Sequence, residues 1–188
     1  MCTPPGDTYT VAYAVGVAIC GVLVLTFYGY IPDRPNVDLL WGGFAGHKFK
    51  FKVVSVVTAT SFLVMYAYAI GYNLVTAELL ASTFVFFVGA CGWAIVAACT
   101  GDANSIPVHV HRVFVWITAV GSVAMAATYI MATNCGHAPH KEVAQTAVII
   151  VAIHHVVIDG VLWAVTLRGS RTLPGSMEMT TAALRTRL

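Results

Sequence analysis

The sequence predicts an all-α integral membrane protein, a polytopic bundle of five transmembrane helices. Hydrophobic residues make up 59% of the 188 residues and charged residues only 10%, whereas soluble domains contain about 25% charged residues. The apolar residues gather in five runs, each long enough to cross a hydrocarbon core about 30 Å thick. No repeat and no soluble segment separates them, so residues 1–188 are expected to form a single membrane-embedded domain.

The spans are expected, in chain order, at about residues 8–30, 53–73, 79–100, 107–133 and 143–167. The first span contains no charged residue, and Tyr28 and Tyr30 at its end suit the membrane interface, where aromatic rings anchor a helix. The connection after it is the longest in the chain, and its prolines and glycines break regular structure.

The second and third spans follow each other closely, joined by a tight turn that contains Glu78. Pro107 begins the fourth span, because proline suits the first turn of a helix, and Asn104 or Ser105 can cap it. A short polar loop, residues 134–142, leads to the fifth span. The chain then ends in a basic tail.

The distribution of Lys and Arg predicts that the N-terminus lies outside and the C-terminus inside. Positive residues concentrate in the inner connections of membrane proteins. With the N-terminus outside, the outer segments hold only Lys141 of the ten basic residues. The inner segments hold the other nine, which are Arg34, Lys48, Lys50, Lys52, Arg112, Arg168, Arg171, Arg185 and Arg187.

Basic and aromatic residues alternate where the second span begins. Lys48, Lys50 and Lys52 flank Phe49 and Phe51. Lysine stems lie along apolar surface while their ammonium groups reach acidic lipid head groups, so we expect bound lipid here. The net charge of +2 is too small to indicate a nucleic-acid partner.

The cysteines predict one possible crosslink. In the predicted orientation Cys2 and Cys135 both lie on the outer side, whereas Cys20, Cys91 and Cys99 lie within spans. An oxidising outer compartment would allow a Cys2–Cys135 disulfide, and two free thiols that never meet are the alternative. The sequence has no CxxC motif, which argues against a thiol-redox centre or a zinc ribbon.

Polar residues inside the last two spans form the candidate site. His154, His155 and Asp159 interrupt the fifth apolar run, where a polar group without a partner costs several kcal/mol. His155 and Asp159 are one helical turn apart and share a face. The fourth and fifth spans are antiparallel, and the distances of Arg112 and Asp159 from the inner ends of their spans, at 1.5 Å per residue, differ by no more than an arginine side chain can reach. We therefore predict an Arg112–Asp159 ion pair, flanked by the histidines.

Three interpretations of this cluster remain open. The ion pair and histidines would fix the register of two helices, as a structural device. Alternatively His109 or His111 opposite His154 or His155 would ligate haem b through two imidazoles. A proton or quinone site using these histidines and Asp159 is the third, since intramembrane His and Asp side chains mark proton relays. The histidine boxes of membrane desaturases are absent, which counts against a non-haem metal site.

One span resembles part of a known family. Residues 48–73, with the basic entry, Thr58, Met65-Tyr66 and Gly71-Tyr72, resemble the second helix of microbial rhodopsins. No lysine lies within a span to carry a retinal Schiff base. The Arg-Tyr-x-Asp-Trp motif is also absent, although Arg112-Val-Phe-Val-Trp116 is similar to it. The resemblance implies, as a remote alternative, a truncated rhodopsin-like protein without retinal.

The function that the sequence favours is that of a non-catalytic accessory subunit in a larger membrane protein complex. Motifs of hydrolases, zinc proteases and phosphate-binding loops are missing, so an enzyme is not indicated. Small residues recur at helical spacing and let helix backbones approach closely, either within the bundle or against other membrane subunits. The cofactor- or proton-handling protein is the alternative.

Overall fold

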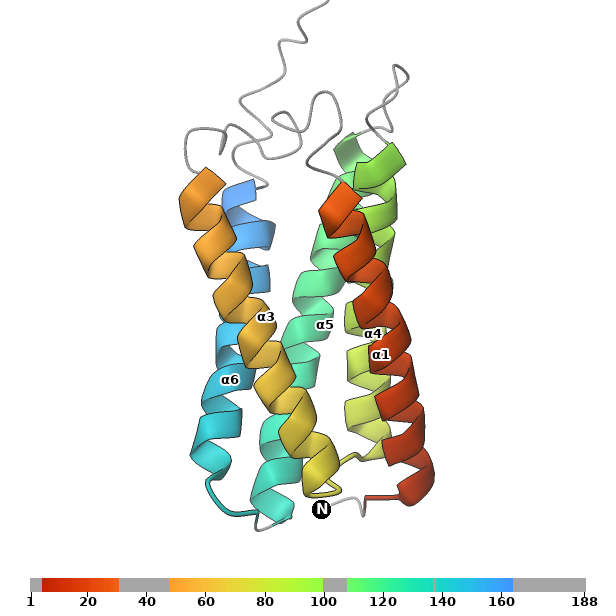
Figure 1. The fold of residues 1–188 in the computed structure, drawn as a ribbon, viewed down its shortest axis with the longest axis vertical. Coiled ribbons are helices and arrows are strands. Elements are labelled where there is room, and N and C mark those ends of the chain that lie inside the picture. The colour runs from red at the N-terminus through yellow and green to blue at the C-terminus, as the bar shows by residue number, and fades with distance from the viewer. Residues whose placement is uncertain (1–4, 31–47, 100–107, 137, 164–188) are drawn as a thin grey trace, which may run out of the picture.

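Five long helices run side by side along the long axis of the molecule (Figure 1). The computed structural model describes residues 5–30, 48–99, 108–136 and 138–163. The described helices are α1 (Asp7–Tyr30), α3 (Lys48–Gly71), α4 (Ala77–Cys99), α5 (Val108–Cys135), α6 (Lys141–Ile153) and its continuation η3 (His154–Trp163).

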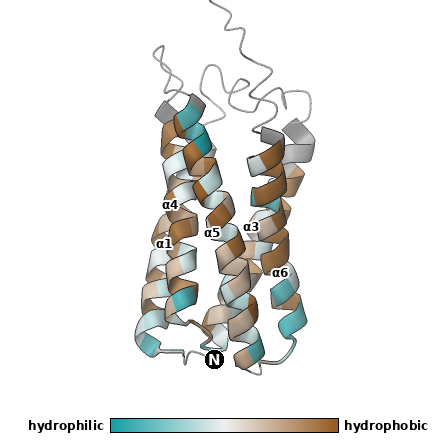
Figure 2. Ribbon diagram, turned by 180° about the vertical axis from the view of Figure 1, so that it is seen from behind, coloured by the Kyte–Doolittle hydropathy of each residue, from teal (hydrophilic) through white to brown (hydrophobic). Residues whose placement is uncertain are grey.

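All five helical rods are long and apolar enough to cross a membrane, and the described residues contain no strand, so the five-helix prediction is confirmed. The qualifying segments are Asp7–Thr26, Val53–Gly71, Ala77–Ala97, His109–Cys135 and Lys141–Val161. Their bounds differ from those expected by a few residues, because polar residues such as Glu78 and Lys141 extend a helix beyond its apolar run. Hydrophilic residues gather toward the helix ends and hydrophobic ones between them (Figure 2).

Helix α5 holds the centre of the bundle. It packs against α4, α6 and η3, while α1 packs against α4 and α3 packs against α6. The α4–α5 contact is the closest because glycines remove the side chains between the two backbones. A Cβ added to Gly89 would lie 2.4 Å from the Thr118 nitrogen, and one added to Gly121 would lie 2.6 Å from the Phe86 Cα. These glycines fix the register of α4 against α5.

Aromatic residues fill the space between the helices. Tyr129 is fully buried, and its hydroxyl donates a hydrogen bond of 2.9 Å to the Met65 carbonyl, which joins α5 to α3. The Tyr66 hydroxyl donates to the Ala14 carbonyl at 3.1 Å and joins α3 to α1. A polar group in a membrane interior must find a partner within the protein, so these bonds also fix how the helices pair.

The last span changes its helical form where its polar residues begin. After the 13 residues of α6, the chain continues as a π-helix from His154 to Trp163. A π-helix forms i→i+5 hydrogen bonds, is rare, and occurs frequently at functional sites. The apolar run of the fifth span predicts an ordinary transmembrane helix, and the structure differs from this in having a π-helix at His154–Trp163, where the candidate site lies.

Several sequence-based expectations lie outside the described residues. They concern the connection 31–47, the capping residues Asn104 and Ser105 with Pro107, and the basic tail. The side chains of Lys48, Lys50 and Lys52 also lie outside the described part of the chain.

Candidate metal centre

Three side chains of the fifth span meet inside the bundle. His154 Nε2 lies 3.7 Å from Asp159 Oδ1, and His155 Nε2 lies 3.9 Å from Asp159 Oδ2. One potential ligand atom from each of the three residues falls within 4.8 Å of the others. Among the described residues, this is the one group of three or more His, Cys, Asp or Glu side chains close enough to hold a metal ion.

The π-helix explains why both histidines reach the carboxylate. His155 and Asp159 are four residues apart and would share a face of an ordinary α-helix. His154 and Asp159 are five residues apart, about 140° around an α-helix at 3.6 residues per turn. The i→i+5 hydrogen bonds of a π-helix instead place residue i+5 above residue i. The two imidazoles therefore flank Asp159 from adjacent positions, with ring centroids 5.0 Å apart.

The His155 ring is held in one orientation. Its Nδ1 lies 2.7 Å from the Val151 carbonyl oxygen, which can only accept, so Nδ1 carries the proton and Nε2 keeps its lone pair. The ring also packs edge-on against Phe86 of α4, with centroids 4.9 Å apart. Metal-ligating histidines commonly donate their second ring N–H to a backbone carbonyl in this way, which fixes the tautomer.

The distances within the cluster suit a bridging ion better than direct hydrogen bonds. Hydrogen bonds between nitrogen and oxygen have lengths of about 2.7–3.2 Å, and the two His–Asp separations exceed that range. Among the described residues the structure shows no hydrogen bond to the Asp159 carboxylate. Donors around a tetrahedral zinc ion lie about 3.3 Å apart, given zinc–ligand distances near 2.0–2.2 Å. The two His–Asp separations would contract by about half an ångström around an ion, and the widest separation in the cluster, which is within 4.8 Å, by up to about 1.5 Å.

The cluster lies deep within the span. At 1.5 Å per residue, the 13 residues of α6 place His154 about 20 Å from the start of a helix that crosses about 30 Å of hydrocarbon. His154 is 7% exposed, His155 14% and Asp159 25%. A buried carboxylate in hydrocarbon requires a neutralising partner, and a metal cation bound here would supply that charge.

The predicted ion pair between Arg112 and Asp159 is not among the contacts of the described residues. The Asp159 carboxylate lies beside His154 and His155, and the Arg112 Nε is buried with no hydrogen-bond partner among the described residues. Arg112 and Asp159 lie at different depths in the bundle. A Cβ on Gly160, the residue after Asp159, would lie 3.8 Å from the Ala119 Cβ, so Asp159 lies near the level of Ala119. Arg112 precedes Ala119 by seven residues, which is about 10 Å along α5.

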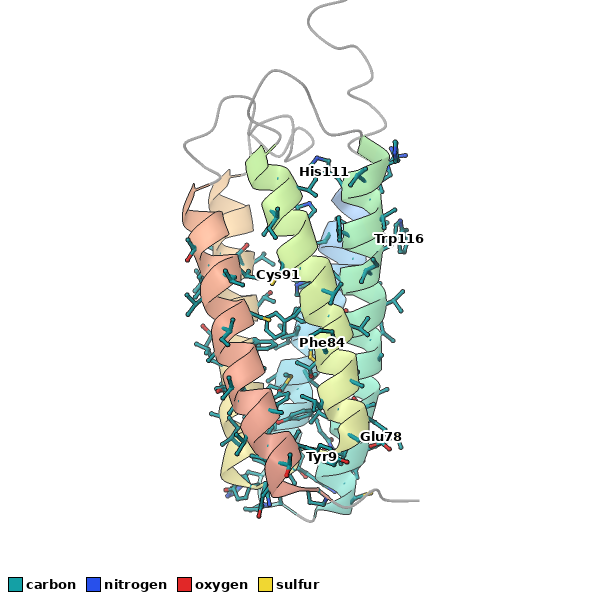
Figure 3. The ribbon with its side chains drawn as sticks, turned by 90° about the vertical axis from the view of Figure 1, so that its right-hand side faces the viewer. Tyr9, Glu78, Phe84, Cys91, His111 and Trp116 are labelled. Carbon is teal, nitrogen blue, oxygen red and sulfur yellow. The ribbon has the colours of Figure 1, made fainter. Side chains whose placement is uncertain are left out.

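The same register separates the two pairs of histidines. His111 lies near one end of the bundle, opposite the end that holds Tyr9 and Glu78 (Figure 3). His111 precedes Ala119 by eight positions along α5, and His154 precedes Gly160 by six positions along η3, which runs in the opposite direction. The two pairs of histidines therefore differ in depth by about 20 Å. Two axial imidazoles must lie within a few ångströms of each other, so a haem b shared by these pairs does not fit. The proton and quinone interpretations stay predictions.

The remaining predicted residues occupy other places. His109 is exposed near the start of α5, and His111 is buried at 3% exposure. Cys135 is disulfide-bonded, and its predicted partner Cys2 lies outside the described residues. Cys20 and Cys91 are free, and the Cys91 thiol lies 3.9 Å from the Cys20 carbonyl oxygen of α1.

Two contributors to the site were missed in the sequence analysis. The Val151 carbonyl orients His155, and the i,i+4 spacing between these two residues is the signal that indicates it. Phe86 lies on another helix, and nothing in the local sequence links it to His155. Comparison of the chain with models of protein families, with curated proteins and with solved structures finds no match.

Proposed function

We propose that this protein is an integral membrane protein that binds a divalent transition-metal ion at His154, His155 and Asp159. The observation that carries the proposal is the convergence of three ligand atoms within 4.8 Å on a π-helical segment deep in the bundle. The oriented His155 ring supports it, because the Nε2 lone pair is available for an ion without any change of tautomer.

The ligand types define the class of metal. Imidazole nitrogen suits zinc, copper, iron and nickel, whereas magnesium and calcium prefer oxygen ligands. Two histidines and one carboxylate are the ligand set of catalytic zinc sites and of non-haem iron centres with open positions. Zinc is the reference ion for the first test, because it has no redox chemistry and no geometric preference from d-electrons.

Equilibrium dialysis of the detergent-purified, chelator-treated protein against Zn²⁺ tests the proposal. The wild-type chain is expected to retain zinc, and the His155→Ala and Asp159→Asn variants are expected to lose at least about 100-fold in affinity, since even outer-shell changes cost 10–100-fold. His109→Ala is the matched control, because this exposed histidine lies on α5 and outside the cluster.

Two results would contradict the proposal. One is a wild-type chain that retains no zinc, and the other is equal loss of zinc in the control and in the cluster variants. Thermal unfolding of each variant, followed by circular dichroism, separates a lost ligand from a lost fold. His154→Ala provides an independent cluster variant should the Asp159 change prevent folding.

We further propose that the N-terminus lies outside and the C-terminus inside. The excess of basic residues at one set of connections supports this orientation. The disulfide of Cys135 supports it too, because disulfides persist in oxidising compartments. An epitope tag at the N-terminus is expected to bind antibody on intact cells, and a C-terminal tag only after permeabilisation. The reverse pattern would refute the orientation.

A second candidate function, that of an accessory subunit, rests on the surface of α1. Only 11% of its most apolar window is buried within the molecule, compared with 50% for α4. Gly16 and Gly21 have no neighbour within 4 Å at the position of an added Cβ, so another helix can approach there.

Photo-crosslinking in the membrane tests this second candidate. A photoreactive residue in place of Val15, which is 53% exposed, is expected to crosslink a protein of one defined mass. The crosslink should disappear when Gly16→Leu blocks the face. Val120 on α5, which is 63% exposed, is the matched control position. Crosslinks to lipid alone from both positions would exclude the docking role.

A further inference from the structure

We infer that the metal ion at His154, His155 and Asp159 carries one more ligand from outside the chain, a small monovalent anion. This inference rests on the metal site proposed above and extends it by naming the class of ligand that the site would take. It follows from the charge of the site, the direction of its ligands and the positions of the other acidic residues.

The charge count requires a second anion. Neutral histidine is the metal-binding form of imidazole, so the two histidines add no charge, and Asp159 contributes a single negative charge. A divalent ion with these three ligands carries a net charge of +1. An unpaired charge in hydrocarbon is very unfavourable, and one monovalent anion makes the complete site neutral.

The described chain offers no second carboxylate at this depth. The other described acidic residues are Asp7, Glu78 and Glu142, each in the first turn of its helix. Figure 3 shows Glu78 near one end of the bundle, whereas His154 lies about 20 Å along the last span. Since no described side chain supplies the second negative charge, we infer that an anion from solution does.

The ligands leave room for it on one side of the ion. All three come from one short segment of one helix, within five residues of each other. Zinc sites with three protein ligands keep a water molecule or a substrate in the fourth position. Asp159 remains 25% exposed, so the bundle does not fully cover the carboxylate side of the cluster. A compact anion meets the least steric hindrance at such a position.

The test uses Co²⁺ as a spectroscopic replacement for zinc and azide as the anion. Cobalt is added to the full-length protein in detergent, in buffer that contains a non-coordinating anion only, and its visible ligand-field absorption is recorded during an azide titration. We expect azide to shift and intensify these bands to saturation. Because binding is reciprocal, azide at ten times its dissociation constant should raise the apparent Co²⁺ affinity about tenfold.

Perchlorate at matched ionic strength is the control, since it screens charge without coordinating. A cobalt spectrum and a cobalt affinity that azide leaves unchanged would overturn the inference while leaving the metal site intact. Absence of any protein-dependent cobalt spectrum in the wild-type chain, together with no zinc retention in dialysis, would instead refute the metal site itself. The two failures are therefore distinguishable.

Discussion

The orientation of one imidazole determines the chemistry of the candidate site at the level of single residues. The His155 Nδ1–H donates to the Val151 carbonyl at 2.7 Å, so the lone pair of Nε2 points toward Asp159 rather than into the helix backbone. A ring without this bond would exchange between two tautomers and two orientations. The backbone carbonyl thus orients an imidazole that would serve as the ligand of the proposed ion, without itself being a ligand.

Tyr129 provides a separate test at the residue level. Replacing Tyr129 with Phe removes the 2.9 Å hydrogen bond to the Met65 carbonyl while keeping the aromatic ring. We expect the free energy of unfolding to fall by about 0.5–1.5 kcal/mol, the net value of a typical intramolecular hydrogen bond, since hydrogen bonds between membrane helices average about 0.6 kcal/mol and reach about 1.7 kcal/mol. Unfolding in mixed micelles measures the change. Tyr72→Phe is the control, because Tyr72 is 46% exposed, and an equal loss in both variants would contradict the assignment.

At the level of helices, close packing of α4 and α5 sets the depth of every residue on α5. Gly89 lies against Thr118 and Gly121 lies against Phe86. Since Phe86 also contacts the His155 ring, the same glycines place α4 beside the candidate metal centre. A change in their register would move Phe86 away from the imidazole it supports.

Substitution of Gly89 is expected to force these helices apart. A Cβ at this position would lie 2.4 Å from the Thr118 nitrogen and 2.8 Å from its Cα, atoms that cannot rotate away. Gly89→Ala should therefore lower the unfolding free energy by about 1–3 kcal/mol, the usual effect of overpacking. In contrast, Gly16→Ala meets no atom within 4 Å and should be neutral or slightly stabilising. Equal thermal midpoints for the two variants would contradict this packing.

For the molecule as a whole, five membrane-spanning helices were predictable from length and hydrophobicity alone. Contact between His155 and Asp159 was also predictable, because an i,i+4 pair meets on any α-helix. The participation of His154 was not, since it depends on the π-helix. The position of Arg112 was not either, because the depth of one span against another depends on packing, such as the Gly121–Phe86 contact, that the local sequence does not specify.

The disulfide of Cys135 gives a prediction at the scale of the whole molecule. Cys135→Ser should lower the unfolding free energy by about 2–4 kcal/mol, the usual effect of losing a disulfide. A reducing agent should lower the thermal midpoint of the wild-type chain toward that of the variant and leave the variant unchanged. Cys91→Ser is the control, because Cys91 is free. A variant that still responds to the reducing agent would contradict the prediction.

X-ray absorption spectroscopy of the zinc-loaded protein tests the central claim most directly, because it reports the atoms bonded to the ion. The account predicts nitrogen and oxygen ligands at about 2.0–2.2 Å, with the outer-shell scattering of two imidazoles and no sulfur at about 2.3 Å. A sulfur shell, which would place the ion at cysteine thiolates, or a spectrum without imidazole scattering would contradict a centre made of His154, His155 and Asp159.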